Sequence, residues 1–420
     1  MIKQCASVLI VCLCAIPLFA GGSAEEVPDD AVELTLGSWR TDDVDQMGRI
    51  LSAFHEEHPN IRVNFDPTNP PDYNATLRLQ LESGTGPDVF YSRSYETGRD
   101  LFADGYKVDL GDQAFVSERF DRGTLEPWQT AEGAQFGMPL LAVSHGVYYN
   151  VELFDELGLS IPETWDEFFD VAETIADAGY IPVANGLADE WDITEVFWMN
   201  IAPSVIGGAE GRSAYEAGER PFNDDAIVEV FETLARVEPY LPDGYEAISY
   251  NDSKALFQLQ DAAMWFDGSW TVSEFDAQGM DFDWSIFAPP APAGGESRIT
   301  FHPDAGIAIN PDSPHQEEAL TFLEWLSGPE ASAMFGNELA GFFPMVADAP
   351  ELENERANTF LGLNEGRETD VRFTWPVLMS GDPSAYELIQ QGSIGVITGG
   401  MTPREAADAL HEGVMSWYTP

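Results

Sequence analysis

Strand-like and helix-like segments alternate near the N-terminal end of the chain, and this alternation constrains the fold more than any other feature. Residues 32–39 (VELTLGSW), 61–66 (IRVNFD) and 87–92 (PDVFYS) have the composition of strands. Between them, 43–60 and 73–84 carry apolar residues at helical spacing. A β-α-β-α-β order predicts a parallel, doubly wound sheet, and ligands of such sheets bind beyond the carboxyl ends of the strands.

The rest of the chain continues the α/β pattern. Thr164 and Glu167 have the spacing of a capping box, and Thr402 followed by Pro403 marks another helix start. The apolar run 262–266 reads as a short buried strand that ends in a turn. A chain of 420 residues is too long for one core, so we expect two or three domains.

Residues 1–24 have the organisation of a secretory signal peptide: a positive charge at Lys3, an apolar stretch, and small residues at the cleavage point. All three cysteines (Cys5, Cys12, Cys14) lie inside it, so the processed chain would have no disulfide, thiol nucleophile or zinc-thiolate site. Their surroundings do not suit a lipid anchor. We therefore expect a soluble protein exported to the periplasm or another extracytoplasmic space.

Acidic residues outnumber basic ones by 73 to 19, which gives a formal net charge of −54. Nucleic acid binding is excluded, because it requires basic clusters that neutralise phosphates. Anionic ligands are disfavoured for the same reason, although one buried arginine is enough to hold one. The acids are spread along the chain, as on a solvated surface suited to high salt, and a trap for cations is the alternative.

Four segments occur in an order and spacing typical of a known family. They are 58–92, 137–175 (GMPLLAVSHGVYYN…), 257–270 (FQLQDAAMWFDGSW) and 319–335 (ALTFLEWLSGPEASAMF). Together they resemble extracellular solute-binding protein family 1 of bacterial sugar ABC importers, the group that includes maltose-binding protein. The resemblance covers nearly the whole chain after the signal peptide.

The resemblance implies an α/β, two-lobed periplasmic-binding-protein fold of type II. Each lobe would be a mostly parallel sheet flanked by helices, and the chain would cross between lobes near 142–146, 298–303 and 343–348. The implied N-lobe is 25–142 plus 303–344, and the implied C-lobe is 146–298 plus 349–420.

The implied function is to bind a sugar in the cleft between the lobes and deliver it to a membrane permease with a cytoplasmic ATPase. A sugar that contacts both lobes favours closure by hinge rotation. No bond is made or broken in this process, so the chain is expected to be no enzyme, to need no cofactor or metal, and to act as a monomer.

Sugars present apolar faces and polar edges, so their sites combine aromatic platforms with hydrogen-bonding groups. Trp270 resembles the tryptophan of the family's "GSW" turn at the cleft edge. The other candidate platforms are Trp39, Tyr91, Trp191 and Trp375. The candidate polar contacts are Arg40, Asp43, Asp88, Arg93, His145 and Asp304. Each has an alternative as a packing or solvated group: Asp88 can cap a turn, and His145 can serve the hinge.

Other functions are harder to reconcile with the residues. A glycosidase needs two facing carboxylates, and no motif singles out such a pair among so many acids. A polyamine or another cation is the alternative ligand, since acids and aromatic rings suit cation capture. A surface scaffold without a transported ligand is a third possibility. Val143 stands where relatives often carry an acid or a polar residue, which leaves the identity of the ligand open.

Overall fold

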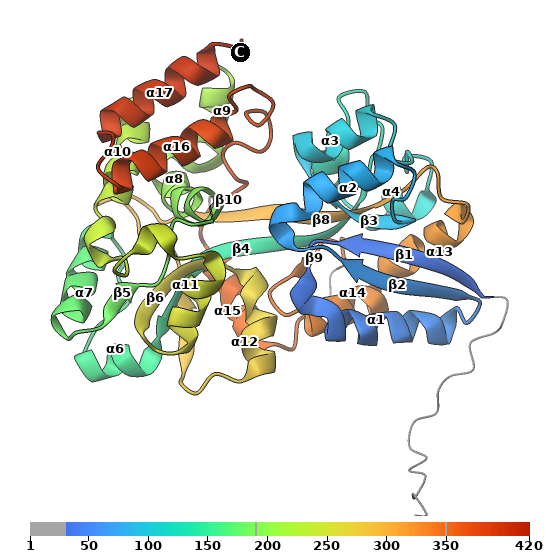
Figure 1. The fold of residues 1–420 in the computed structure, drawn as a ribbon, viewed down its shortest axis with the longest axis horizontal. Helices are drawn as coiled ribbons and strands as arrows, with labels where there is room; N and C mark the ends of the chain where they lie inside the picture. Colours follow the sequence, from blue (N-terminus) through green and yellow to red (C-terminus); the bar gives the residue numbers. More distant parts are fainter. Residues whose placement is uncertain (1–30, 190, 349–350) are drawn as a thin grey trace, which may run out of the picture.

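The computed structural model of the chain describes residues 31–189, 191–348 and 351–420, so the predicted signal peptide lies outside the described residues. Two lobes lie side by side and are joined by the long strands β4 (Met138–Asn150) and β8 (Ile299–Ile309), as Figure 1 shows. The predicted α/β, two-lobed architecture is confirmed.

The strands follow the order β2-β1-β3-β8-β4-β6-β5 across the molecule. The remaining strands are β1 Val32–Ser38, β2 Ile61–Pro67, β3 Val89–Arg93, β5 Ile181–Val183, β6 Ala262–Gly268, β7 Trp284–Phe287, β9 Phe343–Pro344 and β10 Thr369–Asp370.

The sheets are mixed, which corrects the prediction of mostly parallel sheets. β1 pairs in parallel with β2 and β3, as the alternating pattern predicted. However, β8 runs antiparallel to β3 and β4, and β4 runs antiparallel to β6 and β7. The reason is that β4 enters the second lobe and β8 returns from it, so their neighbours cannot all point the same way.

The helices surround these strands. They are α1 Val44–Glu57, α2 Tyr73–Glu82, α3 Tyr95–Ala103, α4 Ala114–Arg119, α5 Arg122–Leu125, α6 Val151–Leu157, α7 Trp165–Asp177, α8 Met199–Ile206, α9 Gly208–Glu216, α10 Asp225–Ala235, α11 Tyr250–Gln258, α12 Val272–Gln278, α13 Gln316–Leu326, α14 Pro329–Glu338, α15 Glu355–Asn364, α16 Ala385–Ile397 and α17 Pro403–Met415. Within the described residues, none of the helices is both long and apolar enough to cross a bilayer.

The helix starts read from the sequence are present. The side chain of Thr164 accepts from the backbone N–H of Glu167, and the Glu167 carboxylate bonds back to the Thr164 backbone, which completes the predicted capping box. Thr402 caps α17 in the same way, with Glu405 as its partner and a proline at the first helical position. Each such cap stabilises its helix by about 1 kcal/mol.

The first lobe, called the N-lobe here, is organised around one hydrophobic core. Met47, Ile50, Leu51 and Phe54 lie on one face of α1, as their helical spacing requires, and all are buried. They pack with residues of β1, β3, α2 and α13, and the ring of Phe54 meets that of Phe322 edge-on at 5.0 Å. In Figure 1, α1 and α14 cover one side of this sheet, and α2 and α3 cover the other.

The second lobe, called the C-lobe here, has a larger core. It joins the inner faces of α7, α8, α10, α16 and α17 to β5 and β6. Trp198 is fully buried in it. A further cluster of aromatic side chains, including Tyr148, Trp265 and Phe275, fills the region beside the hinge strands.

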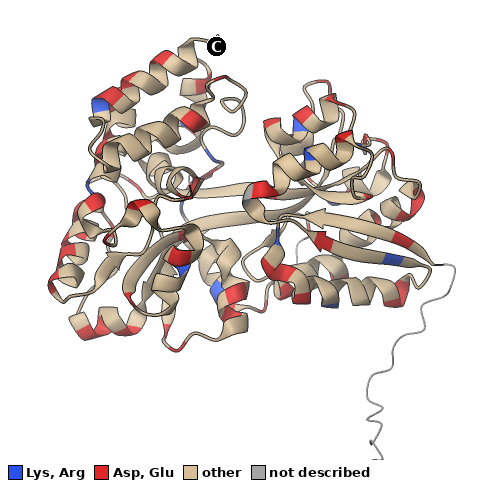
Figure 2. Cartoon of the chain, in the orientation of Figure 1, with Lys and Arg blue, Asp and Glu red and all other residues tan. Residues whose placement is uncertain are grey.

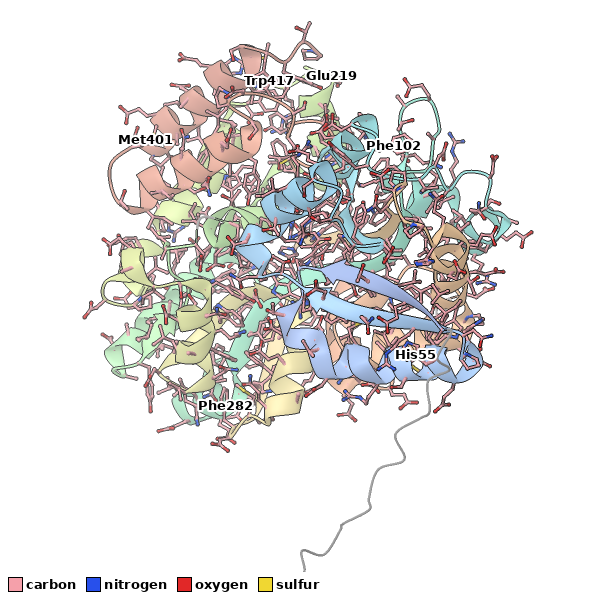
Figure 3. The ribbon with its side chains drawn as sticks, turned by 45° about the vertical axis from the view of Figure 1, so that its right-hand side comes forward. His55, Phe102, Glu219, Phe282, Met401 and Trp417 are labelled. Atoms are coloured by element: carbon pink, nitrogen blue, oxygen red, sulfur yellow. The ribbon has the colours of Figure 1, made fainter. Side chains whose placement is uncertain are left out.

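The surface carries the acid excess. Figure 2 shows acidic residues along the helices of both lobes with few basic residues among them. Side chains fill most of the space between the ribbons when they are drawn as sticks, as Figure 3 shows. The acidic residues therefore form a solvated shell over both lobes rather than a single acidic patch.

Candidate functional site

The turn after β6 places Trp270 between the two lobes. The indole is half-buried and packs against both the N-lobe core and the C-lobe core. Its N–H donates to the Tyr250 hydroxyl at 2.8 Å, and the Arg40 guanidinium reaches its backbone carbonyl at 3.4 Å. A Cβ at Gly268 would overlap the indole, so the glycine of this turn allows the ring to fold back over the strand end.

The hinge strands place two imidazoles next to Trp270. His145 on β4 and His302 on β8 are both fully buried, with ring centroids 5.4 Å apart. His145 meets the Trp270 ring edge-on at 5.3 Å, and His302 meets the Trp375 ring at 5.0 Å. Burial, with the charge of Arg372, lowers the pKa of both imidazoles, that of His302 to about 3. The rings of Trp270, His145, His302 and Trp375 therefore contact one another in that order. Both imidazoles are neutral at neutral pH.

On the N-lobe side, Arg93 links the end of β3 to the hinge. Its guanidinium carbon lies 3.6 Å from the ring centroid of Trp39, and its Nη1 donates to Asp304 at 3.4 Å. Burial alone would raise the pKa of Asp304, but contact with His302 and the charges of Arg93 and Arg372 outweigh it and lower the pKa to about 2. The Asp304 side chain is therefore ionised at neutral pH.

The loop after β1 is held by an ion pair. Arg40 donates from Nε and Nη2 to the two carboxylate oxygens of Asp43, at 2.7 and 2.8 Å. Both side chains are buried, and the guanidinium carbon lies 4.8 Å from the Phe342 ring centroid. Such a two-fold contact fixes the loop, and with it the Arg40 contact to the other lobe.

On the C-lobe side, Arg372 contributes a second buried guanidinium. Its Nη1 lies 2.6 Å from the Glu195 carboxylate, which also accepts from the Tyr386 hydroxyl at 3.1 Å. Its guanidinium carbon lies 4.4 Å from the Trp375 ring centroid. The loop that follows β10 thus brings a cation and an indole to the same hinge imidazoles.

Two buried acidic side chains near Trp270, Asp192 and Asp267, form no ion pair within the described residues. Asp267 accepts from the hydroxyls of Tyr250 and Thr271, and burial raises its pKa to about 7 in spite of these bonds. Burial, together with the charge of Asp267, raises the pKa of Asp192 well above its usual range. The ring of Trp191 lies 4.7 Å from that of Tyr250 and covers this region.

These contacts form one chain of interactions across the lobes, which we call the junction network. It runs from Trp39 through Arg93, Asp304 and the hinge imidazoles to Trp270 and Tyr250. Ten of the predicted site residues belong to it: Trp39, Arg40, Asp43, Tyr91, Arg93, His145, Trp191, Trp270, Asp304 and Trp375. Whether they contact a ligand remains a prediction.

Asp88 lies apart from the junction network. It precedes β3, at the end of the strand opposite Arg93, and its carboxylate accepts from Thr35 and Ser313 within the N-lobe. The structure therefore gives Asp88 the turn-fixing role that the sequence left open. Tyr91 lies under Trp39 and is almost fully buried, with its hydroxyl directed at the Met47 sulfur, so it acts as packing.

Four members of the junction network are absent from the sequence prediction. They are Tyr250, Asp267, His302 and Arg372. His302 stands two residues before Asp304, and Arg372 is one of few basic residues and stands three before Trp375, so both carried a weak signal. Tyr250 carried none, because its place depends on how α11 packs beside the turn.

Many buried polar atoms at the junction have no partner within the described part of the chain. They include His145 Nε2, both ring nitrogens of His302, Arg372 Nε and Trp375 Nε1. Asn200 Oδ1, Thr194 Oγ1 and Asp192 Oδ2 add to them from the C-lobe. Buried polar groups are almost always hydrogen-bonded in native proteins, so the junction retains unused hydrogen-bonding capacity.

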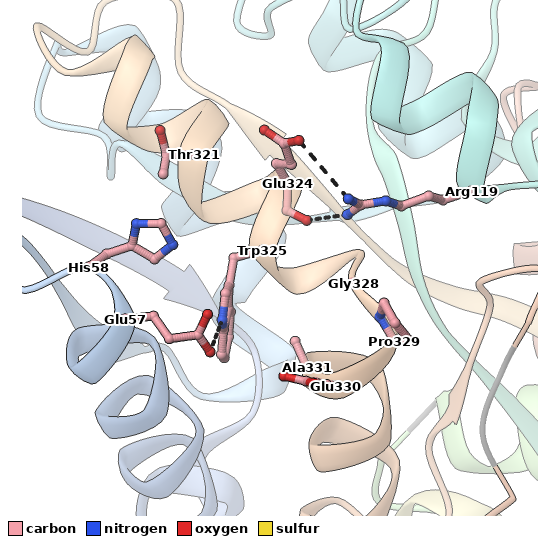
Figure 4. Close-up of a pocket in the computed structure, with 10 residues that line it drawn as sticks. All are labelled: Glu57, His58, Arg119, Thr321, Glu324, Trp325, Gly328, Pro329, Glu330 and Ala331. Atoms are coloured by element: carbon pink, nitrogen blue, oxygen red, sulfur yellow. Dashed lines mark hydrogen bonds and ion pairs between the residues drawn. The ribbon is translucent and has the colours of Figure 1, made fainter.

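Surface hollows lie on the N-lobe, and one of them reaches the junction network. One of about 290 Å³ on the N-lobe is bordered by the end of α1 and by α13 and α14, with Trp325 donating to Glu57 as Figure 4 shows. It includes no predicted site residue. A smaller hollow of about 130 Å³ between α2 and α3 reaches Tyr91 and Arg93. In the described ranges, no group of three or more His, Cys, Asp or Glu side chains is arranged to hold a metal ion.

Comparison with known proteins identifies the class. The profile of the bacterial extracellular solute-binding protein family matches residues 38–333, and the chain belongs to this family. The family consists of binding components rather than enzymes, which confirms the prediction that the chain is no enzyme. Its members act outside the cytoplasm, in agreement with the predicted location in coarse terms.

Individual relatives have low sequence identity to this chain. The multiple sugar-binding protein of Streptococcus mutans is 27% identical over 67% of this chain and 68% of its own length. The xylose/arabinose-binding protein of Haloferax volcanii is 24% identical over 86% of this chain and 79% of its own. A solved structure from a study of xylan utilisation by a thermophilic bacterium superposes with a TM-score of 0.80 at 18% identity, over 91% of this chain and 99% of that one.

Proposed function

We propose that this chain is the sugar-binding component of an ABC importer and that it holds its ligand at the junction network. The observation that carries the proposal is the concentration of unpartnered buried polar atoms between indole rings of both lobes. Saccharides supply what such a site lacks, namely hydroxyls that donate and accept and apolar C–H faces that stack on indoles. The names of the two relatives described above point to the same class of ligand.

The mechanism follows from the position of the site. Residues of both lobes and of both hinge strands contribute to the junction network, so one bound sugar would bridge them. A ligand that contacts both lobes binds the closed arrangement more tightly and shifts the population toward it. The closed form would then be recognised by membrane permease subunits coupled to a cytoplasmic ATPase.

The remaining parts of the proposal concern organisation. We propose that the lobes divide at 142–146, 298–303 and 343–348, as the resemblance implied. Strand β4 supports this division, because it pairs with β8 up to Ser144 and with β6 and β7 from His145 onward. We also propose that the chain works as a monomer and is exported by its N-terminal segment without a lipid anchor.

Trp270 provides the test. A panel of neutral mono- and oligosaccharides, with spermidine as the rival ligand, is screened by thermal shift, since a ligand of the folded state raises the melting temperature. Trp270→Ala is then compared with the parent by titration calorimetry, and we expect an affinity loss of about tenfold or more, or ~1.4 kcal/mol. Trp325→Ala, in the N-lobe hollow away from the junction, is the matched control and should keep the parent affinity.

Two outcomes contradict the proposal. Stabilisation by spermidine and by no saccharide would replace it with the cation-binding alternative. Equal sugar affinity of Trp270→Ala and the parent would remove the junction network as the site.

A further inference from the structure

Three arginines of this acidic chain stand at the junction network. Arg40 is held by both carboxylate oxygens of Asp43, whereas Arg93 and Arg372 are less fully paired. The side chains of Arg93 and Arg372 are 21% and 3% exposed, whereas Arg236 in a surface pair is 51% exposed. Withdrawing a guanidinium from water is costly unless its charge and N–H groups find partners. In a protein with 19 basic residues against 73 acidic ones, two such cations beside the proposed sugar site require an explanation.

Neither guanidinium has its hydrogen bonds completed within the described residues. A guanidinium offers five N–H donors. Arg93 makes a single bond of 3.4 Å to Asp304 and lays its face on Trp39. Arg372 pairs with Glu195 through Nη1, while its Nε is buried without a partner. Both therefore retain donors without a partner.

Other donors around them are also unpartnered. The amide of Asn200 lies 3.5 Å from His145 Nδ1 and donates to it, which leaves the ring proton on His145 Nε2, a buried atom without a partner. The indole N–H of Trp375 is also buried without a partner. A neutral His302 adds one N–H more. Its other ring nitrogen and Asn200 Oδ1 are unpartnered acceptors, so donors outnumber acceptors around the hinge, and an acceptor would complete most of the open bonds.

The two arginines act on the same spot from opposite lobes. Arg93 donates to Asp304 at 3.4 Å, and Arg372 lies 4.4 Å from the ring of Trp375, which is itself 5.0 Å from that of His302. The charges of both arginines lower the pKa of His302 and of Asp304, in agreement with this geometry. Arg93 comes from β3, and Arg372 from the loop after β10. An anion at this spot would contact both lobes, and its binding would favour their closure.

We propose that the ligand is an acidic sugar, a uronic acid residue alone or within an oligosaccharide, whose carboxylate lies between Arg93 and Arg372 and whose ring stacks on the adjacent indoles. This inference rests on the sugar-binding function proposed above and specifies its substrate class. A carboxylate matches the planar donor edge of a guanidinium.

Charge balance favours a carboxylate over a phosphate. The charges of Arg93 and Arg372 are matched by those of Asp304 and Glu195, so the site is close to neutral before the ligand enters. A single negative charge surrounded by unpartnered donors is then better accommodated than the two charges of a sugar phosphate. The surrounding acidic shell opposes any anion, but at ~1 M salt its field is screened within about 3 Å, while buried contacts are screened much less.

The first experiment compares matched ligands on the full chain in a buffer of constant ionic strength. D-Galacturonate and D-glucuronate are tested against D-galactose and D-glucose by thermal shift and calorimetry, with galactose 6-phosphate as a further anion. We expect one of the uronates to bind at least about tenfold more tightly than its neutral counterpart. We also expect its affinity, and not that of the neutral sugar, to fall with added salt.

The second experiment removes the charge. Arg93→Gln should bring the ratio of uronate affinity to neutral-sugar affinity to about one, and this ratio is the readout because Arg93 also belongs to the proposed sugar site. Arg298→Gln is the control: this side chain is also largely buried, but its carboxylate partner Glu368 occupies it at 2.7 Å. The melting temperatures of both unliganded variants verify that they fold.

The outcomes separate the two proposals. Binding of neutral sugars with no binding of uronates overturns the acidic-sugar inference and leaves the sugar-binding function standing. Binding of neither class overturns both. Tighter binding of the sugar phosphate, or a uronate preference that survives in Arg93→Gln, also overturns the inference.

Discussion

Two carboxyl groups of the junction network, Asp304 and Asp267, differ in the sign of their pKa shift although both are buried, at 7% and 0% exposure. Asp304 lies among Arg93, Arg372 and His302, and its pKa falls to about 2. Asp267 is bonded mainly to neutral hydroxyls, and burial raises its pKa to about 7. Burial is common to both, so the neighbours decide whether a buried acid is charged.

The difference divides the junction into a hinge side and a turn side. The hinge side contains the guanidinium groups and a carboxylate that is always ionised. The turn side contains Asp192 and Asp267, and neither is paired with a guanidinium in the described residues. The hydroxyls of Tyr250 and Thr271 donate to Asp267. Under the proposals above, the hinge side would meet charged groups of a ligand and the turn side its hydroxyls.

The largest effect is expected when the cation of the hinge side is removed. Arg372→Met leaves the Glu195 carboxylate, 19% exposed, without its ion-pair partner. Breaking a buried pair in this way costs about 3 kcal/mol of unfolding free energy. Urea denaturation at pH 7 and constant salt measures it. Arg236→Met, which breaks the exposed pair with Asp166, should cost about 0.5 kcal/mol or less, and equal losses would contradict the distinction.

The turn side is tested by Asp267→Asn across pH. The folded-state pKa of Asp267 is raised, so its contribution to stability is complete below its ordinary pKa and is lost as the pH rises toward 7. Between about pH 4.5 and 6.5, the stability of the variant relative to the parent should therefore rise by up to ~1.4 kcal/mol per pH unit. Urea denaturation at several pH values gives this difference, and a flat difference would show that Asp267 is ionised.

His302→Gln should give the opposite slope. The pKa of His302 is depressed to about 3, so its contribution is present above the ordinary histidine pKa and is lost as the pH falls from about 6.5. The variant should then gain on the parent as the pH falls, again by up to ~1.4 kcal/mol per unit. In the double variant with Asp267→Asn and His302→Gln, the pH dependence of the unfolding free energy should return toward that of the parent, because the two substitutions change it in opposite directions.

The smallest effect concerns the hydrogen bond of Trp270. Trp270→Phe keeps an aromatic ring between the lobes but removes the N–H that donates to Tyr250. We expect a loss of about 1 kcal/mol of unfolding free energy, well below that of Arg372→Met. A loss as large as that of Arg372→Met would show that the indole, and not the ion pair, holds the junction together.

Much of the fold could be predicted because its signals are local. The helical spacing of Met47, Ile50 and Phe54 and the capping box at Thr164 depend only on nearby residues, and both appear in the structure. The direction of the strands depended on distant contacts. The antiparallel hinge strands contradicted a parallel pattern that was correct for β1, β2 and β3.

Membership of the junction network was predictable where strand ends or turns pointed to it and unpredictable elsewhere. Trp39 and Arg93 end strands, and Trp270 follows a turn, so sequence position alone indicated them. Asp88 looked equivalent to Arg93 in the same strand segment but lies at its other end. Tyr250 and Arg372 were missed because they reach the junction through the packing of α11 and of the loop after β10.

The sequence alone determined the α/β alternation, the acid excess, the helix caps and the aromatic turn after β6, since each depends on residues close together in the chain. The tertiary structure decided which acids are charged, which indoles meet which imidazoles, and that two arginines from opposite lobes converge on the hinge. The physical reason is that pKa values and ring contacts depend on distance in space, which the chain sets only after it has folded.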